Sequence, residues 1–207
     1  MKPWLFDILA CPIDKHFPLK LFIFNYENKP EDFESFLNIY DKRDIEQIKK
    51  EDIIKILKKD QNLYLKDNVI IEENTLEVYL DLIISSLNEL INIRDKSPYD
   101  ISKKTLDIAR TVIKQRIIEF SKNLNKEKVE EILPELYLIN KLKIESEIES
   151  GILFCEKCYR WFPIIETIPQ MLPDEYRDEQ KEIEFLKTNK NLLDDEFLNQ
   201  DLKPFNI

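Results

Sequence analysis

The residues best suited to bind a metal ion stand in two short motifs far apart in the chain. Cys155 and Cys158 form a Cys-x-x-Cys pair, and Cys11-Pro-Ile-Asp14 repeats that spacing with a carboxylate in the last place. Zinc prefers four tetrahedral ligands, and structural sites join two such knuckles that are distant in sequence. The spacing therefore predicts one structural zinc held by Cys11, Asp14, Cys155 and Cys158.

His16 leaves the identity of the fourth ligand open. It lies two residues after Asp14, and an imidazole is a better zinc ligand than a carboxylate. Two metal-free alternatives also remain, namely buried free thiols or a disulfide between Cys155 and Cys158. A thiol redox role is less well supported, because the strand-like residues around this pair offer no helix start that would lower a thiol pKa.

The composition argues against catalytic machinery in this chain. Gly151 is the only glycine among 207 residues, whereas phosphate loops and dinucleotide or adenosyl-type cofactor turns need several glycines for positive φ and close backbone approach. His16 is the only histidine, and no serine stands in a glycine-flanked elbow, so histidine-based triads are nearly excluded. We therefore expect a protein that is not an enzyme and has no catalytic cofactor of its own.

The net charge of the chain indicates which kinds of molecule it can bind directly. The chain has 41 acidic and 31 basic residues and a formal net charge of -10, which repels phosphate, so we expect no strong direct binding to nucleic acid. No segment approaches the roughly 20 apolar residues of a membrane span. The first ten residues also lack the features of a signal peptide. The expected location is the cytoplasm, away from membranes.

The order of the sequence patterns predicts an α+β fold built from both chain ends. Short apolar and aromatic runs predict strands at residues 18–26, 152–155 and 159–165. We expect a small zinc-ribbon-like β module from residues 1–27 and 143–176, with an α-helical bundle inserted at residues 28–142. Residues 177–207 form a charged C-terminal extension with scattered apolar residues, in which we expect one or two helices.

Apolar residues recur at spacings of three and four along the predicted insertion, which indicates amphipathic helices packed on a core. The two longest are predicted near residues 76–91 and 101–124, and shorter ones at 31–39, 44–59 and 126–140. Residues 63–71 alternate imperfectly and predict either a strand or a loop. The two clearest stripes are Leu76, Tyr79, Leu80, Ile83, Leu87, Leu90 and Ile91, then Leu106, Ala109, Ile113, Ile117 and Phe120.

Both ends of the chain together resemble the Trm112-like family of small zinc-ribbon methyltransferase activators. The matching residues are Leu9-Ala10-Cys11-Pro12 with Phe17-Pro18-Leu19, then the run from Gly151 to Ile164, and Ile168-Pro169 with Leu172-Pro173. These motifs cover about a quarter of the chain and are more specific than a lone Cys-x-x-Cys. The main departure is Asp14, where zinc-bearing members of the family place a cysteine.

The resemblance implies a non-catalytic activating and stabilising subunit of S-adenosylmethionine-dependent methyltransferases that modify tRNA, rRNA or a translation release factor. The implied partner is a Rossmann-fold methyltransferase, which binds S-adenosylmethionine itself and pairs strand to strand with this chain in a heterodimer. An alternative is a nucleic-acid-binding zinc ribbon, suggested by the aromatic residues near the knuckles. The residues expected to contact the methyltransferase are Trp4, Leu5, Leu9, Phe162, Ile164, Ile165, Ile168, Met171 and Leu172.

Overall fold

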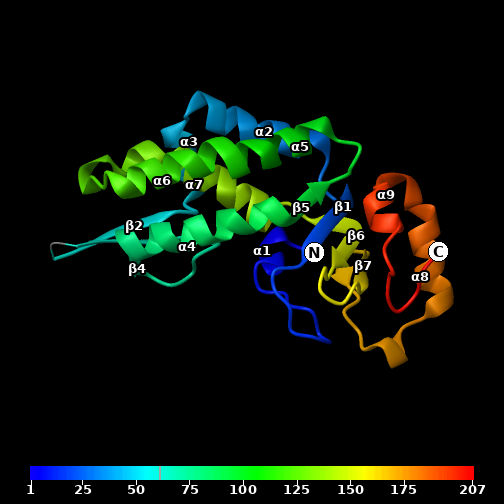
Figure 1. The fold of residues 1–207 in the computed structure, drawn as a ribbon. Helices are drawn as coiled ribbons and strands as arrows, with labels where there is room; N and C mark the ends of the chain where they lie inside the picture. Colours follow the sequence, from blue (N-terminus) through cyan, green and yellow to red (C-terminus); the bar gives the residue numbers. More distant parts are fainter. Residues whose placement is uncertain (61) are drawn as a thin grey trace. The chain divides into compact units, whose positions relative to one another are not determined.

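The structure, a computed structural model, describes residues 1–60 and 62–207 and mixes helices with two β-sheets. The chain divides into two compact units. Unit 1 combines Met1–Glu27, Asn92–Pro98 and Glu147–Ile207, and unit 2 combines Asn28–Ile91 and Tyr99–Ser146. Figure 1 shows the elements of both units with the labels used below.

Unit 1 is built on a five-stranded sheet in the order β5-β1-β6-β7-β8. Its central strand pair is β1 (Lys20–Tyr26) with β6 (Ile148–Phe154), which are far apart in the sequence and run antiparallel. On one side lies the parallel strand β5 (Ile93–Asp95); on the other lie β7 (Trp161–Ile165) and β8 (Ile168–Pro169), both antiparallel to their neighbours. The predicted insertion therefore returns to this sheet for three residues.

The backbone of β1 leaves no room for a side chain at Gly151 in β6. Gly151 lies opposite Ile23, next to a register shift in β1. A Cβ atom at this position would stand 2.4 Å from the carbonyl oxygen of Phe22, well inside van der Waals contact. The only glycine of the chain thus permits a close backbone approach inside the sheet.

The C-terminal residues pack against one apolar region of this sheet. After η5 (Asp174–Tyr176) they form α8 (Glu179–Thr188), η6 (Lys190–Leu192) and α9 (Asp195–Leu198), drawn in orange and red in Figure 1. The ring of Phe197 meets those of Phe22 and Phe154 edge-on at 5.2 and 5.0 Å between centroids. The shared apolar cluster consists of Phe22, Phe24, Ile152, Phe154, Trp161, Leu186, Leu193, Phe197 and Leu202.

Unit 2 is mainly helical. Its helices are α2 (Pro30–Lys42), α3 (Ile45–Glu51), α4 (Leu76–Glu89), α5 (Asp100–Ile108), α6 (Lys114–Lys122) and α7 (Leu133–Asn140). A π-helical turn, η2 (Ala109–Ile113), joins α5 to α6, while η3 (Lys126–Ile132) and η4 (Lys141–Glu145) flank α7. The predicted stripes are buried, except that Ile91 is 62% exposed and Phe120 is half-buried. Leu90 and Ile91 belong to η1 (Leu90–Asn92), which follows α4.

A small sheet in unit 2 corrects one sequence prediction. The helix predicted at residues 44–59 ends at Glu51, because Asp52 adopts the left-handed conformation at φ 57°. The chain then forms β2 (Lys55–Lys59), which pairs with β3 (Asn62–Lys66), and β3 pairs with β4 (Asn74–Thr75). Only part of the segment 63–71 is therefore a strand.

Candidate metal centre

Two loops of unit 1 have the same backbone geometry. In loop 1 (Cys11–His16), the Cys11 N–H donates to the His16 carbonyl and the Lys15 N–H donates to the Cys11 carbonyl, both at 2.9 Å. Lys15 adopts a left-handed conformation at φ 59°. These bonds fold the loop tightly, so that the side chains of its first and fourth residues point to one place.

Loop 2 (Cys155–Arg160) repeats this pattern position by position. The Cys155 N–H donates to the Arg160 carbonyl and the Tyr159 N–H donates to the Cys155 carbonyl, both at 2.8 Å. Tyr159 also has φ 59°. Position four of the loop is Cys158, which corresponds to Asp14 in loop 1.

The two loops bring four ligand atoms together. One from each of Cys11, Asp14, Cys155 and Cys158 lies within 4.8 Å of the other three. The sulfur atoms of Cys11 and Cys158 are 3.7 Å apart, and the sulfur of Cys155 is 3.6 Å from Oδ1 of Asp14. Ligands around a tetrahedral zinc lie about 3.8 Å apart for two sulfurs and about 3.5–3.7 Å apart for sulfur and oxygen. The residues thus lie close enough to hold one metal ion.

His16 contributes its backbone to this centre, while its ring is not among the converging ligand atoms. Besides the carbonyl bond to Cys11, its N–H donates to Oδ1 of Asp14 at 3.0 Å. Desolvation pushes the pKa of the Asp14 carboxyl up, but this N–H, the Cys11 side chain and the charge of Lys157 outweigh it, so the pKa is lowered. Asp14 is therefore an anion at neutral pH.

The first cysteine of each loop is fully buried, and burial controls its protonation in the metal-free protein. Burial raises the pKa of the Cys11 thiol to about 12, against the opposing N–H groups of Asp14 and Ile13. Burial likewise raises the pKa of Cys155, against the N–H groups of Cys158 and Lys157. A redox-active thiol needs the opposite shift, whereas a bound cation removes these protons.

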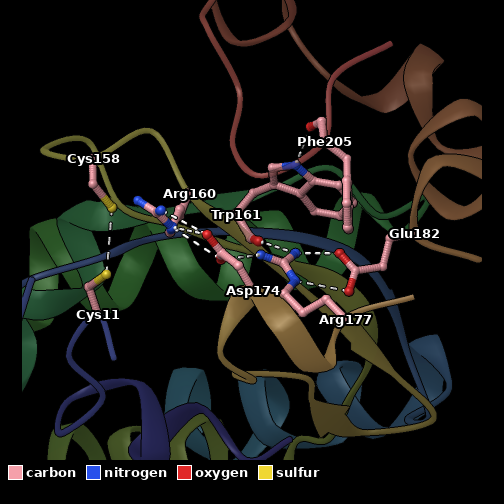
Figure 2. A network of polar contacts seen from close by, with 8 residues as sticks. All are labelled: Cys11, Cys158, Arg160, Trp161, Asp174, Arg177, Glu182 and Phe205. Atoms are coloured by element: carbon pink, nitrogen blue, oxygen red, sulfur yellow. Dashed lines mark hydrogen bonds and ion pairs between the residues drawn. The ribbon is translucent and has the colours of Figure 1, made fainter. Parts of the chain in front are cut away.

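A chain of ion pairs extends from loop 2 to the C-terminal residues (Figure 2). Arg160 donates from Nε and Nη2 to the carboxylate of Asp174 at 2.8–3.2 Å. These hydrogen bonds, together with the neighbouring Cys158, raise the pKa of the Arg160 guanidinium. Nη1 of Arg177 lies 4.0 Å from Oδ1 of Asp174, and Arg177 also pairs with the buried Glu182. The metal-binding loop is thereby tied to the segment that follows the sheet.

The pairing of Arg160 with Asp174 could not be predicted from the sequence. Their separation by 14 residues gives no local signal, because the pair forms only when the turn after β8 folds back. An arginine directly after a Cys-x-x-Cys-x motif would be the only cue available. The sequence also did not indicate the exposed side chains of Ile8, Ile13 and Phe17, which are 66%, 42% and 43% exposed.

The residues expected to contact a partner fall into three groups by exposure. Trp4, Ile168 and Leu172 are exposed, at 40%, 60% and 43%. Four others are half-buried: Leu5, Leu9, Ile165 and Met171.

Phe162 and Ile164 differ from that expectation. Both side chains have no exposed surface, and Trp161 and Pro163 on the opposite face of β7 are buried as well. They belong to the core of unit 1 and do not reach its surface, so any role in binding a partner would be through the strand that they stabilise.

The fold and the site define a class of protein: a small β-sheet unit in which two similar loops, distant in the sequence, bring four metal-ligating residues together. Comparison with protein families matches residues 2–166 to the Trm112p-like proteins, which is more than three quarters of the chain. The chain belongs to the Trm112p-like family, and this membership suggests a methyltransferase activator role in general. No curated protein and no solved structure matches the chain.

Among the helices of the described residues, none combines the length and the apolar character that crossing a membrane would require.

Proposed function

We propose that this chain is a non-catalytic activating and stabilising subunit of S-adenosylmethionine-dependent methyltransferases that modify tRNA, rRNA or a translation release factor. The observation that carries the proposal is the family match over residues 2–166. In the proposed heterodimer a Rossmann-fold methyltransferase binds the cofactor and performs the reaction in the cytoplasm. The present chain covers apolar surface on that partner and holds it in its active conformation.

Exposed apolar side chains of unit 1 support a protein-binding role. Trp4, Ile168 and Leu172 are exposed, and half-buried Leu5, Leu9, Ile165 and Met171 are close to them in the sequence. A contiguous patch of exposed apolar side chains is typical of a surface that another protein covers. We propose these seven residues as the contact set.

The metal centre is proposed to hold one structural zinc through Cys11, Asp14, Cys155 and Cys158. Distances suited to tetrahedral coordination support zinc, as do three thiol ligands. When bound, the ion cross-links loop 1 to loop 2 and so joins two segments that are far apart in the sequence. Metal analysis of the purified protein should give one zinc per chain, and a metal-free protein with normal stability would contradict the assignment.

Co-expression with the methyltransferases of the native cell tests the activator role. We expect at least one methyltransferase to copurify with the chain and to gain solubility or activity from it. Ile168→Asp should weaken this association, whereas Ile71→Asp, at a 76% exposed apolar residue in unit 2, is the matched control. Failure of every methyltransferase to associate would refute the role.

A further inference from the structure

One side of strand β7 is paired with a neighbouring strand along only part of its length. β6 lies on the other side, while β8 pairs with Ile164 and Ile165 alone. Tyr159, Trp161 and Pro163 alternate along the chain and present their backbone groups on this second side. An incompletely paired strand edge is the part of a sheet that accepts a strand from another protein.

Lys203 occupies the open part of this edge as a parallel one-residue bridge. Its N–H donates to the carbonyl of Tyr159 at 2.9 Å, and its carbonyl accepts from the N–H of Trp161 at 3.3 Å. The chain therefore pairs a residue from its own C-terminal region with the edge of β7, in the manner of an added strand.

The remaining carbonyl groups of this edge are also satisfied from within the chain. Nη2 of Arg177 donates to the carbonyl of Trp161 at 2.7 Å. The N–H of Gln170 donates to the carbonyl of Pro163 at 2.8 Å, and Pro163 has no N–H to offer. All these partners lie beyond residue 166, where the family match ends.

Phe205 provides the second anchor of the bridge, as Figure 2 shows. Its carbonyl accepts a hydrogen bond from the indole Nε1 of Trp161 at 3.0 Å. Its ring centroid lies 5.7 Å from the guanidinium carbon of Arg177, which also stacks near the ring of Trp161. Lys203 thus bonds to two backbone groups of β7, and Phe205 contacts the indole of Trp161 and the guanidinium of Arg177.

The tail segment, residues 203–207, is attached more weakly than the residues before it. Lys203, Asn206 and Ile207 are exposed, and Pro204 and Phe205 are half-buried. Leu202, by contrast, is only 2% exposed and belongs to the apolar cluster with α8 and α9. The tail segment can therefore leave the edge of β7 while Leu202, α8 and α9 keep their apolar contacts, and its departure uncovers the part of the Trp161 indole that bonds to Phe205.

We propose that the tail segment occupies the edge of β7 from Tyr159 to Trp161 and must leave it before a strand of the methyltransferase can pair there. The inference rests on the proposed function and adds a regulatory contact to it. The partner strand would take over the two backbone bonds of Lys203. The tail segment thereby protects an edge that would otherwise pair with unrelated strands.

A tail segment on the edge of β7 lowers the apparent affinity for the partner by an amount set by how often the edge is open. When a binding site is open for only a fraction of the time, the apparent dissociation constant is the intrinsic one divided by that fraction. A tail segment that covers the edge about nine-tenths of the time therefore weakens partner binding about tenfold. Releasing the tail should restore the intrinsic affinity.

The double variant Lys203→Pro with Phe205→Ala tests this consequence in the full-length chain. Proline removes the N–H that bonds to Tyr159, and alanine removes the ring that stacks on Arg177, while Leu202 stays in place. Lys203→Ala is the matched control, because it changes the side chain and keeps both backbone bonds. Circular dichroism melting verifies that each variant is folded before calorimetry measures its affinity for the copurifying methyltransferase.

We expect the double variant to bind the methyltransferase about tenfold more tightly than the wild-type chain, and Lys203→Ala to bind like the wild type. Equal or weaker binding by a folded double variant, with a wild-type chain that does bind, refutes the tail contact and leaves the activator role intact. If no form binds any methyltransferase, both proposals fail together.

Hydrogen exchange in the isolated wild-type chain gives a readout that needs no partner. If the tail segment opens locally, the amide of Trp161, which bonds to Lys203, should exchange through this opening well before the unit unfolds. The amide of Phe162, on the side of β6, should exchange only with unfolding of the sheet. Equal exchange rates for the two amides would refute a detachable tail segment.

Discussion

Loop 1 and loop 2 share one backbone design but differ in the side chains they place on it. Both close with hydrogen bonds from residues one and five and with a left-handed residue at φ 59°. Loop 2 offers two thiols and is supported by the Arg160–Asp174 ion pair, whereas loop 1 offers a thiol and a carboxylate. The backbone of each loop therefore fixes where a ligand atom lies, while the side chain at that position decides whether the ligand is a thiol or a carboxylate.

Removing a buried thiol should have the largest effect on this pair of loops. Cys155→Ser should abolish metal binding and lower the free energy of unfolding by about 4 kcal/mol or more, because the cross-link between loop 1 and loop 2 is lost. Metal analysis and thermal melting measure both changes. A chelator should shift the melting temperature of the wild type toward that of Cys155→Ser and leave the variant unchanged. A variant that keeps one metal per chain would show that the site lies elsewhere.

Making the two loops chemically alike is the next test. Asp14→Cys should raise metal affinity more than about tenfold, or ~1.4 kcal/mol, since thiolate is the stronger zinc ligand. The isosteric Asp14→Asn should lower affinity by a similar factor, because a neutral amide replaces the anion. Competition titration with a chromophoric chelator measures all three proteins. Identical affinities would remove Asp14 from the ligand set.

The Asp14→Cys variant should also change how metal affinity depends on pH. The pKa of Asp14 is lowered, so its carboxylate is already ionised at neutral pH and releases no proton when metal binds. A cysteine there must lose a proton first, as Cys11 does with its pKa of about 12. Between pH 6 and 8, the logarithm of the metal affinity should therefore rise more steeply with pH for Asp14→Cys than for the wild type. The difference in slope should be about one log unit per pH unit. Parallel pH profiles would contradict this.

Substitutions at position six, Arg160 in loop 2 and His16 in loop 1, should have smaller effects on stability that differ between the two loops. Arg160→Ala should cost about 1 kcal/mol of stability through its lost bonds to the partly exposed Asp174. His16→Ala should change stability by less than about 0.5 kcal/mol and leave the metal content intact, because only the His16 backbone joins the centre. Chemical unfolding and metal analysis compare the two. Metal loss in His16→Ala would instead make its ring a ligand.

The left-handed residues should give the smallest effects. Lys15→Gly should stabilise the protein by about 0.5 kcal/mol, since glycine adopts φ 59° without steric cost. Tyr159→Gly should destabilise it by about the same amount, because the Tyr159 ring lies 6.5 Å from that of Phe154 and this contact is lost. Urea unfolding of both variants measures the difference. Equal effects would mean that the aromatic contact contributes nothing.

Much of the local structure was predictable from periodicity and spacing. The stripe of α4 and most of the stripe along α5 to α6 are buried as predicted, because apolar spacing of three and four fixes one helical face. The strands at residues 18–26 and 159–165 correspond to β1 and β7. The helix predicted through residue 59 was wrong, since its apolar residues after Asp52 fit a strand equally well at that short length.

Contacts between distant segments could not be predicted in the same way. β5 has only three residues, too few for any periodic signal, and it becomes a strand because β1 offers it a parallel edge. Residues 177–207 looked like a charged extension, yet Leu186, Phe197 and Leu202 pack into the cluster of unit 1. Scattered apolar residues show that a segment can dock but do not show where.

The sequence by itself determined the two Cys-containing motifs, the resemblance to the family and the absence of glycine-rich cofactor loops, because these are properties of residue type and local spacing. The tertiary structure alone decided which side chain of loop 1 joins the centre, that Phe162 and Ile164 are core, and that Lys203 lies on the edge of β7. The reason is physical: local order follows from neighbours along the chain, whereas ligand convergence and edge pairing depend on segments that meet only after folding.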